Sequence, residues 1–393
     1  NRELLLIFPK QVLSRIIQLT GSFPSTIVPY AEQSFLRMLL QKNQMIFEGF
    51  GEESGVRYYL PLQSDIFKVQ GNVEEREYYL ISEGMRELIE KMGDEVILDL
   101  GSKEEVVIRS GKAKYTSRAL NAEEFPEFPY EFKEKEGCWT VRSDVLAKAL
   151  KKTIFTLGSE QNIEYSNVLL LHFHPEKIVH PEGGPVVRLV TTDAFRLCLY
   201  EIPLAEEGKE EKYYLDGSAI KILHRILPAR EETMEIYMYD RYSACVLPQM
   251  HYYINQVQRN FPNYEVILDR EMPNRVVFER EALSKHLSRV DIWAKMQTRP
   301  YTVLFSIHPD NVEISTEPEQ IGPAYEELPC KLEGAPLKIA LNSRYILEYI
   351  NTLQSEKVVF LYKDASSVCC WYPEDEPQSR YYLMPVRHSA VEE

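Results

Sequence analysis

Residues 143–157 read SDVLAKALKKTIFTL, and this stretch sets the interpretation of the whole chain. When its residues are placed at about 100° intervals around a helix axis, the apolar side chains fall on one side. These are Val145, Leu146, Ala149, Leu150, Ile154 and Leu157. Lys148, Lys151 and Lys152 fall on the opposite side. The stretch therefore predicts an amphipathic helix with one buried face and one basic face.

The same helix pattern occurs twice more, at residues 10–19 and 281–290. Leu13, Leu146 and Leu283 occupy equivalent positions, 133 and 137 residues apart. A second helix pattern follows each first one, at residues 83–92, 218–227 and 343–353, and a strand-like run follows each second helix, at 96–100, 234–238 and 358–362. A period this long is far above the roughly 20–50 residues of solenoid repeats, so it indicates duplicated domains.

The three units also end alike, with FPEF at 125–128, FPNY at 261–264 and YYLMPVR at 381–387. Strand patterns dominate between the helices, as at residues 168–173, 186–191 and 301–307. Such patterns also recur by chance in α+β chains, but the matched order and spacing favour duplication. We predict three α+β domains, each with two helices and antiparallel sheets, at residues 1–134, 135–266 and 267–393.

Bulk composition indicates a folded protein in a reducing compartment. The chain has 393 residues, of which 44% are hydrophobic and 27% are charged. Its six cysteines form no CxxC pair, and Cys369 and Cys370 are adjacent, so neither a metal site nor a disulfide framework is expected. The apolar run at residues 4–8 is too short for a signal peptide, and no segment is long enough to span a bilayer. We expect a cytoplasmic protein without a membrane partner.

The net charge of −15 taken alone argues against a nucleic-acid partner, yet the basic residues are not evenly distributed. In the helix pattern at 218–227, Lys221, His224 and Arg225 lie opposite the apolar face. Lys285 and Arg289 lie away from the apolar face of 281–290, and Arg15 stands out on the first helix. These faces suit contacts with phosphates that carry no sequence information. The alternative is that Lys and Arg decorate ordinary solvated helix faces.

No nucleotide-binding or hydrolase motif is present: GxxxxGK[ST], GxSxG, HExxH and GxGxxG are all absent. His172 and His174 form an HxH pair that could chelate a metal from one strand face. No carboxylate or thiolate with ligand-like spacing accompanies the pair, so two histidines on a surface strand are the preferred interpretation. We therefore expect no enzyme activity, no cofactor and no metal.

Several motifs resemble one known family. LVTTDAFRLCLYEI at 189–202 resembles the ATDGHRLA signature of bacterial sliding clamps, and FPNYEVIL at 261–268 resembles their FPDY-type link. Residues 153–170 resemble the region where a helix leads into the LNGVLL-type strand, and 339–387 resemble the last clamp domain with its YxxMPxR ending. The resemblance runs from about residue 110 to the end. Earlier, only the helix pattern matches, followed by SGKAKY and FPEFP. The chain is thus similar to the bacterial DNA polymerase III beta subunit, the beta sliding clamp.

This resemblance implies three DNA-clamp domains that form a ring as a head-to-tail homodimer, with helices lining the hole. Such a ring is a non-catalytic processivity factor that encircles double-stranded DNA independently of sequence. The implied partners are the DNA polymerase III alpha subunit, an ATP-driven clamp loader and other proteins with a clamp-binding motif. The alternative is an accessory clamp paralogue or a scaffold that binds peptides away from DNA.

The resemblance also implies a peptide-binding groove between the second and third domains, with Arg196 and Arg387 at its rim. Its residues are Tyr165, Thr192, Ala194, Phe195, Arg196, Leu197, Pro262, Ile267, Tyr382, Leu383, Met384, Pro385, Val386 and Arg387. A mostly apolar cleft containing Met suits this role, although the same residues could simply be core. The family usually has Gly-His at Ala194-Phe195, Leu at Tyr165 and Val at Tyr382, which suggests a more aromatic groove.

For DNA contact, the implied residues are Arg15, Lys148, Lys151, Lys152, Lys221, Arg225, Lys285 and Arg289. For the dimer contact, the resemblance places Lys112, Lys114 and Tyr115 on a first-domain edge strand. Ile292 and Trp293 follow the third-domain helix, and Glu317, Glu319, Glu326 and Glu327 lie nearby in sequence. Opposite charges flanking apolar residues would fix the register of the contact, although ordinary surface charge is the alternative.

Overall fold

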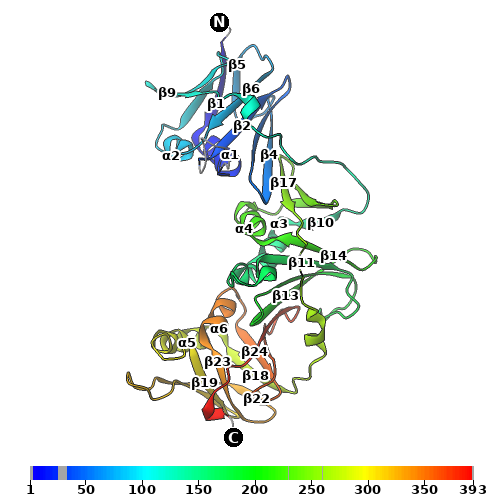
Figure 1. Ribbon diagram of the computed structural model, residues 1–393, viewed down its shortest axis with the longest axis vertical. Helices are drawn as coiled ribbons and strands as arrows, with labels where there is room; N and C mark the ends of the chain where they lie inside the picture. The colour runs from blue at the N-terminus through cyan, green and yellow to red at the C-terminus, as the bar shows by residue number, and fades with distance from the viewer. Residues whose placement is uncertain (1–2, 25–32, 229, 259, 392–393) are drawn as a thin grey trace. The chain divides into compact units, whose positions relative to one another are not determined.

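The computed structural model describes residues 3–24, 33–228, 230–258 and 260–391 (Figure 1). Contacts divide the chain into two compact units. The first comprises residues 1–144 and 225–256, and the second comprises residues 145–224 and 257–393. No helix among the described residues is both long enough and apolar enough to cross a bilayer.

The first unit contains two antiparallel sheets. The five-stranded sheet has the order β5 (Lys68–Gly71), β1 (Leu4–Pro9), β7 (Glu95–Asp99), β8 (Glu105–Ser110) and β9 (Ala113–Arg118). The eight-stranded sheet has the order β10 (Trp139–Arg142), β15 (Thr233–Met238), β16 (Tyr242–Val246), β17 (Met250–Asn255), β4 (Ser54–Pro61), β3 (Gln44–Phe50), β2 (Phe35–Leu40) and β6 (Arg76–Ile81). Helices α1 (Lys10–Thr20) and α2 (Met85–Glu90) pack on each other and share one core with β1 to β4 and β6 to β8.

The second unit has a nine-stranded and a four-stranded antiparallel sheet. The nine-stranded order is β14 (Glu211–Asp216), β11 (Val168–Phe173), β12 (Val186–Thr192), β13 (Arg196–Pro203), β26 (Ser379–Leu383), β25 (Cys369–Pro373), β24 (Lys357–Tyr362), β18 (Asn274–Glu279) and β22 (Lys331–Glu333). The four-stranded order is β21 (Tyr325–Pro329), β20 (Asn311–Ser315), β19 (Thr302–Ile307) and β23 (Leu337–Asn342). Short 3-10 turns follow at η2 (Ile154–Thr156), η3 (Glu164–Asn167), η4 (Tyr264–Asp269) and η5 (Ser389–Val391).

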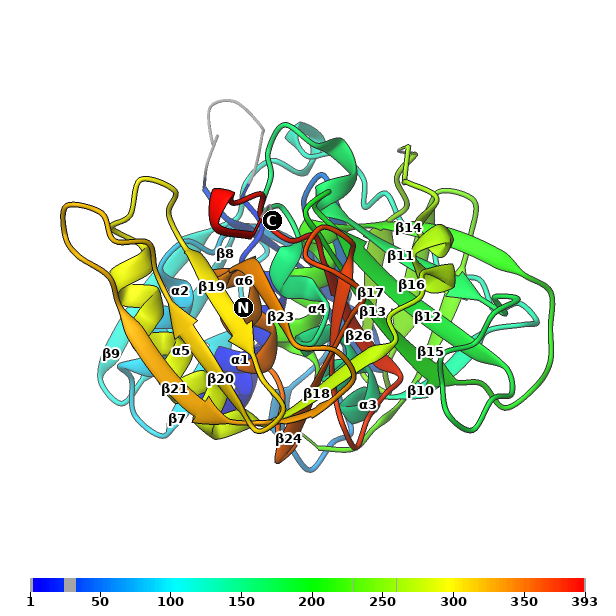
Figure 2. The same cartoon turned by 90° about the horizontal axis from the view of Figure 1, so that it is seen from below.

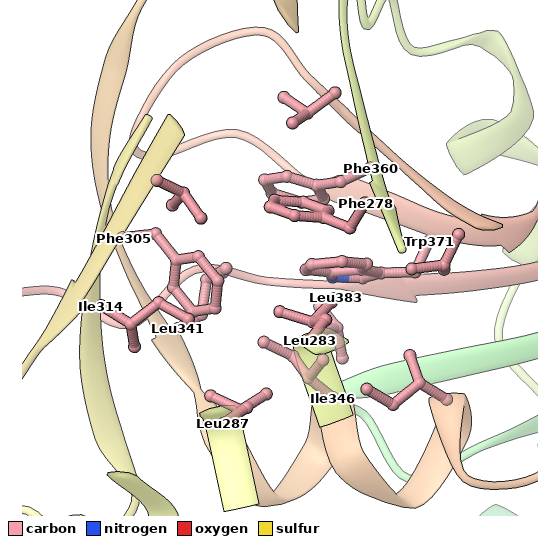
Figure 3. Packing of buried hydrophobic residues seen from close by; sticks show 14 of the residues in the cluster. Phe278, Leu283, Leu287, Phe305, Ile314, Leu341, Ile346, Phe360, Trp371 and Leu383 are labelled. Carbon is pink, nitrogen blue, oxygen red and sulfur yellow. The ribbon is translucent and has the colours of Figure 1, made fainter. Parts of the chain in front are cut away.

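Aromatic stacking organises the largest core of the second unit (Figure 3). The Trp371 ring stacks on Phe360 with a centroid distance of 4.3 Å and on Phe278 with a centroid distance of 5.9 Å. Leu283 and Leu287 from α5 (Arg280–Ala294) and Ile346 from α6 (Ser343–Ile350) complete the cluster. Burying such side chains stabilises the fold by about 1.5–3 kcal/mol each.

The helices confirm the repeated pattern, with one correction. Helices α1, α2, α4 (Gly217–Ile226), α5 and α6 lie where the sequence predicts helices. The helix predicted at 143–157 ends earlier, because α3 covers Ser143–Lys151. Thr153 Oγ1 donates back to the Ala149 carbonyl oxygen at 3.0 Å, and the β-branched Thr153 and Ile154 disfavour continuation.

The division into two units does not follow the predicted boundaries after residues 134 and 266. The eight-stranded sheet joins strands from both sides of residue 134, and the nine-stranded sheet joins strands from both sides of residue 266. Each of these two sheets is continuous across a predicted boundary, so the structure shows no break at residue 134 or residue 266. The three-domain division therefore stays a prediction.

Candidate functional site: a groove and basic helix faces

A cavity of about 370 Å³ lies in the second unit. Its walls come from the turn between β12 and β13, from η4, from the loop after β24 and from the end of β26. Asp193 holds the turn in place, because its Oδ1 accepts hydrogen bonds from the backbone N–H groups of Phe195 and Arg196, both at 3.1 Å. Ala194 at the tip of the turn has φ of 77°, a left-handed conformation that glycine adopts without strain.

Nine of the residues predicted for the groove line this cavity: Thr192, Ala194, Phe195, Arg196, Leu197, Ile267, Tyr382, Leu383 and Met384. Three apolar side chains around it are about half exposed: Phe195 at 50%, Val266 at 52% and Met384 at 53%. Leu197, Tyr382 and Leu383 are buried and form the wall. The interpretation of the residues as core therefore holds for the wall and not for the rim.

Five predicted groove residues lie outside this cavity. Pro385, Val386 and Arg387 line a neighbouring cavity of about 990 Å³, which shares Ser366 and Met384 with the first. Tyr165 packs near Phe261, with a centroid distance of 6.2 Å, and Pro262 is exposed on the segment before η4.

Seven lining residues were not predicted from the sequence: Val266, Arg270, Glu271, Lys363, Ser366, Ser367 and Val368. Val266 belongs to the FPNYEVIL segment, so that motif could have identified it. The loop at 363–368 has no such signal. Asp364 shapes it by accepting from the backbone N–H groups of Ser366 and Ser367 at 3.0 and 2.7 Å.

The prediction that Arg196 forms a polar rim is wrong. Arg196 is 5% exposed and its guanidinium pairs with Asp193 at 3.0 Å and Glu348 at 2.7 Å. Burial lowers the pKa of Arg196, but Tyr381 and the two carboxylates outweigh burial and hold the pKa above its ordinary value. The arginine is thus a largely buried cation in the cavity wall, where Asp193, Glu348 and Tyr381 hold its guanidinium in place. Arg387 remains exposed.

The basic helix faces are only partly as predicted. Lys151, Lys221, Arg225, Lys285 and Arg15 are exposed, and Lys148 is half exposed with its Nζ 2.8 Å from Glu376. Burial lowers the pKa of His224 on α4, and the charge of Lys151 on α3 lowers it further. Arg289 donates to Glu326 Oε1 at 2.9 Å, which neutralises part of its charge.

The placement of Lys152 on an exposed basic face is wrong. Lys152 is 5% exposed, pairs with Glu376 and lies 5.4 Å from the centre of the Tyr200 ring. It lies past the last residue of α3, where the chain leaves the helical path that the prediction assumed. Burial lowers the pKa of Lys152, although Glu376 opposes this effect.

The residues predicted for a dimer contact lie on two sheet edges and a helix end. β9 is the edge strand of its sheet, with Lys112, Lys114 and Tyr115 exposed on it or just before it. β21 is the edge strand of the four-stranded sheet, and α5 packs beside it (Figure 2). Ile292 on α5 is 66% exposed and Trp293 is 36% exposed.

The acidic residues predicted for the same contact make contacts within the chain. Glu317 lies 3.4 Å from His388, and Glu319 accepts from the Thr298 backbone N–H at 2.9 Å. Glu326 pairs with Arg289, which lowers the pKa of this carboxyl, and Glu327 remains exposed.

The expectation that His172 lies on a surface strand is also wrong. His172 is fully buried in β11, with Nδ1 2.5 Å from the Tyr264 hydroxyl and Nε2 2.8 Å from Glu210. Its carboxylate neighbours come from distant parts of the sequence, so no local spacing could reveal them. His174 lies just past the end of β11 with φ of 51° and does not share the strand geometry.

Antiparallel sheets, paired helices and an apolar groove are the features to compare with known proteins. Residues 266–387 match the family model of the DNA polymerase III beta subunit, C-terminal domain. The beta sliding clamp of Synechococcus elongatus is 23% identical over 283 residues, which cover 70% of this chain and 72% of that protein. The beta sliding clamp of Halalkalibacterium halodurans is 19% identical over 357 residues, which cover 90% of this chain and 91% of that protein. The family-model match and these relatives support a DNA polymerase III beta subunit, a sliding clamp that is not an enzyme.

Solved structures show the same fold along nearly the whole chain. The DNA polymerase III beta chain of Streptococcus pneumoniae superposes with a TM-score of 0.86 at 15% identity, covering 98% of this chain and 100% of that one. The beta subunit of Thermotoga maritima gives a TM-score of 0.84 at 19% identity, with the same coverage. The α+β clamp fold predicted from the sequence is confirmed.

Proposed function

We propose that this clamp encircles double-stranded DNA as a head-to-tail homodimer and tethers the DNA polymerase III alpha subunit, the clamp loader and other proteins through the groove of the second unit. The observation that carries the proposal is the 370 Å³ cavity with three half-exposed apolar side chains at its border. Exposed apolar side chains around a concave site mark a place where a partner buries its own apolar anchors.

The DNA contact rests on the exposed cations of α1, α3, α4 and α5. Lysine and arginine side chains that bind phosphates without a fixed register hold the duplex loosely, so the ring slides. Glu376 already neutralises part of the charge of Lys148, and Lys152 is buried. The proposed contact set is therefore Arg15, Lys148, Lys151, Lys221, Arg225, Lys285 and Arg289.

The test is retention on DNA after loading. Wild type should stay on nicked circular DNA and slide off a linear duplex. Reversing Lys148, Lys151, Lys221 and Arg225 to Glu should reduce loading at least about ten-fold and flatten its salt dependence, because phosphate contacts drive both. The matched control reverses Lys42, Lys103, Lys209 and Lys331, which are exposed and lie outside the helix faces, with the same change in net charge.

Equal loss in both quadruple variants would show that net charge, and not the helix faces, governs loading. If wild type bound clamp-motif peptides but was never retained on circles, the alternative of a peptide-binding scaffold away from DNA would replace the proposal.

A further inference from the structure

Three ligand-type side chains converge on one side of the nine-stranded sheet. His172 comes from β11, Glu210 lies immediately before β14, and Glu265 is in the first turn of η4. One ligand atom of each lies within 4.8 Å of the others. His172 is fully buried, Glu210 is exposed and Glu265 is partly buried, so the cluster opens to solvent on its carboxylate side.

The histidine is held in a fixed orientation. Its Nδ1 lies 2.5 Å from the Tyr264 hydroxyl, and Arg188 donates to that same hydroxyl oxygen at 2.9 Å. Arg188 and its partner Glu201 are both fully buried, so the support is rigid. Histidines that bind metals are oriented in this way, with one ring nitrogen hydrogen-bonded and the other directed at the ion. Here Nε2 is directed at the carboxylate of Glu210.

We propose that His172 Nε2 and the carboxylates of Glu210 and Glu265 bind a zinc ion, with water in the fourth position. One imidazole and two carboxylates form a donor set that zinc accepts, and an approach of about 2 Å to each atom requires only small side-chain movements. Magnesium and calcium prefer oxygen ligands alone, so the buried imidazole favours a transition metal over both.

The hydrogen bonds of His172 are compatible with a bound zinc ion. Zinc takes the place of the hydrogen bond between Nε2 and Glu210. The ring proton then resides on Nδ1, and this N–H donates a hydrogen bond to the hydroxyl oxygen of Tyr264.

Lys212 is the competing cation. It pairs with His172 in the register of β11 and β14, and its Nζ lies 3.4 Å from Glu265 Oε1. A zinc ion would have to share Glu265 with this ammonium group or displace it. The site therefore offers one variant that should strengthen binding, beside those that should weaken it.

The test uses the full-length, chelator-treated protein and titrates Co²⁺ and then Zn²⁺, followed by visible absorption and calorimetry. Wild type should bind one ion with a Co²⁺ spectrum of nitrogen and oxygen ligands. E210Q and E265Q should each lose at least about ten-fold in affinity, the scale on which even indirect partners of a metal act. K212Q should gain about ten-fold, because a nearby positive charge is removed. E211Q, a neighbour directed at Tyr213, should bind like wild type.

H172Q should abolish binding, and the two surface glutamate variants carry the test if that buried change prevents folding. Zinc affinity that is the same in wild type, E210Q and E265Q would overturn the proposal. A thiolate charge-transfer band in the Co²⁺ spectrum would overturn it too, because the ion would then be on a cysteine.

Discussion

Ala194 shows how one residue can carry strain at the edge of a binding site. Its φ of 77° lies in the left-handed region, which costs a residue with a Cβ roughly 1–2 kcal/mol relative to its preferred conformations. The clamp signature that the sequence resembles has glycine here. The flanking hydrogen bonds from Phe195 and Arg196 to Asp193 hold the turn in this conformation.

We therefore expect Ala194→Gly to stabilise the protein by about 1 kcal/mol, because relief of strain exceeds the added entropy of the unfolded chain. Denaturant unfolding measures this directly. Ala205→Gly, at an exposed alanine outside the left-handed region, is the matched control. A loss of stability in Ala194→Gly would show that the turn relaxes in solution to a conformation that alanine prefers.

His251 gives the fold a pH dependence. It packs against the rings of Tyr59 and Phe132 at 4.8 and 4.7 Å and lies 3.3 Å from the Tyr253 hydroxyl. Burial, followed by the charge of Arg57, lowers the pKa of His251 to about 4. The unfolded chain takes up this proton near the ordinary histidine pKa of about 6.5. The stabilising contribution is therefore complete above about pH 6.5 and is lost as the pH falls toward 4.

His251→Phe should remove this part of the pH dependence, about 2 kcal/mol or less after solvent screening is allowed for. Thermal unfolding of wild type and variant between pH 7 and pH 4 gives the difference. Parallel profiles for wild type and His251→Phe would mean that His251 titrates normally.

At the end of β26 and in the turn before β13, we expect exposed residues at the groove to serve peptide binding and the buried residues beside them to serve folding stability. Met384 and Phe195 are about half exposed, whereas Leu383 is 2% exposed and belongs to the core around Trp371. We expect the double variant Phe195→Ala, Met384→Ala to bind a clamp-motif peptide at least about ten-fold more weakly, with little change in folding stability. Each apolar side chain that the peptide buries contributes about 1.5–3 kcal/mol at full burial. Leu383→Ala should instead cost about 2–5 kcal/mol of folding stability.

Peptide titration by fluorescence anisotropy, paired with thermal unfolding, separates the two effects. Ile178→Ala, at an exposed apolar residue outside both cavities, is the matched control. Unchanged peptide affinity in the double variant would place the binding surface elsewhere.

Periodicity explains which elements could be predicted. The helices around Leu13, Leu146 and Leu283 were found because an apolar face repeats along a local stretch of chain. Arg196, Lys152 and His172 were misplaced because their partners, Glu348, Glu376 and Glu210, lie far away in the sequence. Whether such a side chain is buried depends on a partner that is distant in sequence, and a single sequence does not show which residues become neighbours in the fold. The polar loop at 363–368 was missed for a similar reason, since only the fold brings it to the groove.

For the whole molecule, the free edges indicate how two copies would associate. β9 presents an edge with Lys114 and Tyr115 exposed, and β21 presents an edge with Tyr325 and Glu327 exposed. Exposed strand edges pair readily with other strands unless they are protected. In the proposed dimer, β9 of one copy would pair with β21 of the other, a heterologous contact, and two such contacts would close a ring.

The apolar residues beside β21 should provide most of the energy of this contact. Ile292 is 66% exposed, Met296 is 54% exposed and Tyr325 is 58% exposed, which is more apolar surface than a solvated edge requires. Ile292→Asp should weaken the dimer at least about ten-fold, because a carboxylate would replace an apolar side chain in the contact. Sedimentation velocity over a concentration series measures the shift toward monomer.

Ile178→Asp, at an exposed apolar residue outside β9, β21 and α5, is the control and should leave the dimer intact. Peptide binding should survive in both variants, because the groove lies within one unit. A chain that is monomeric at every concentration before any substitution would contradict the ring.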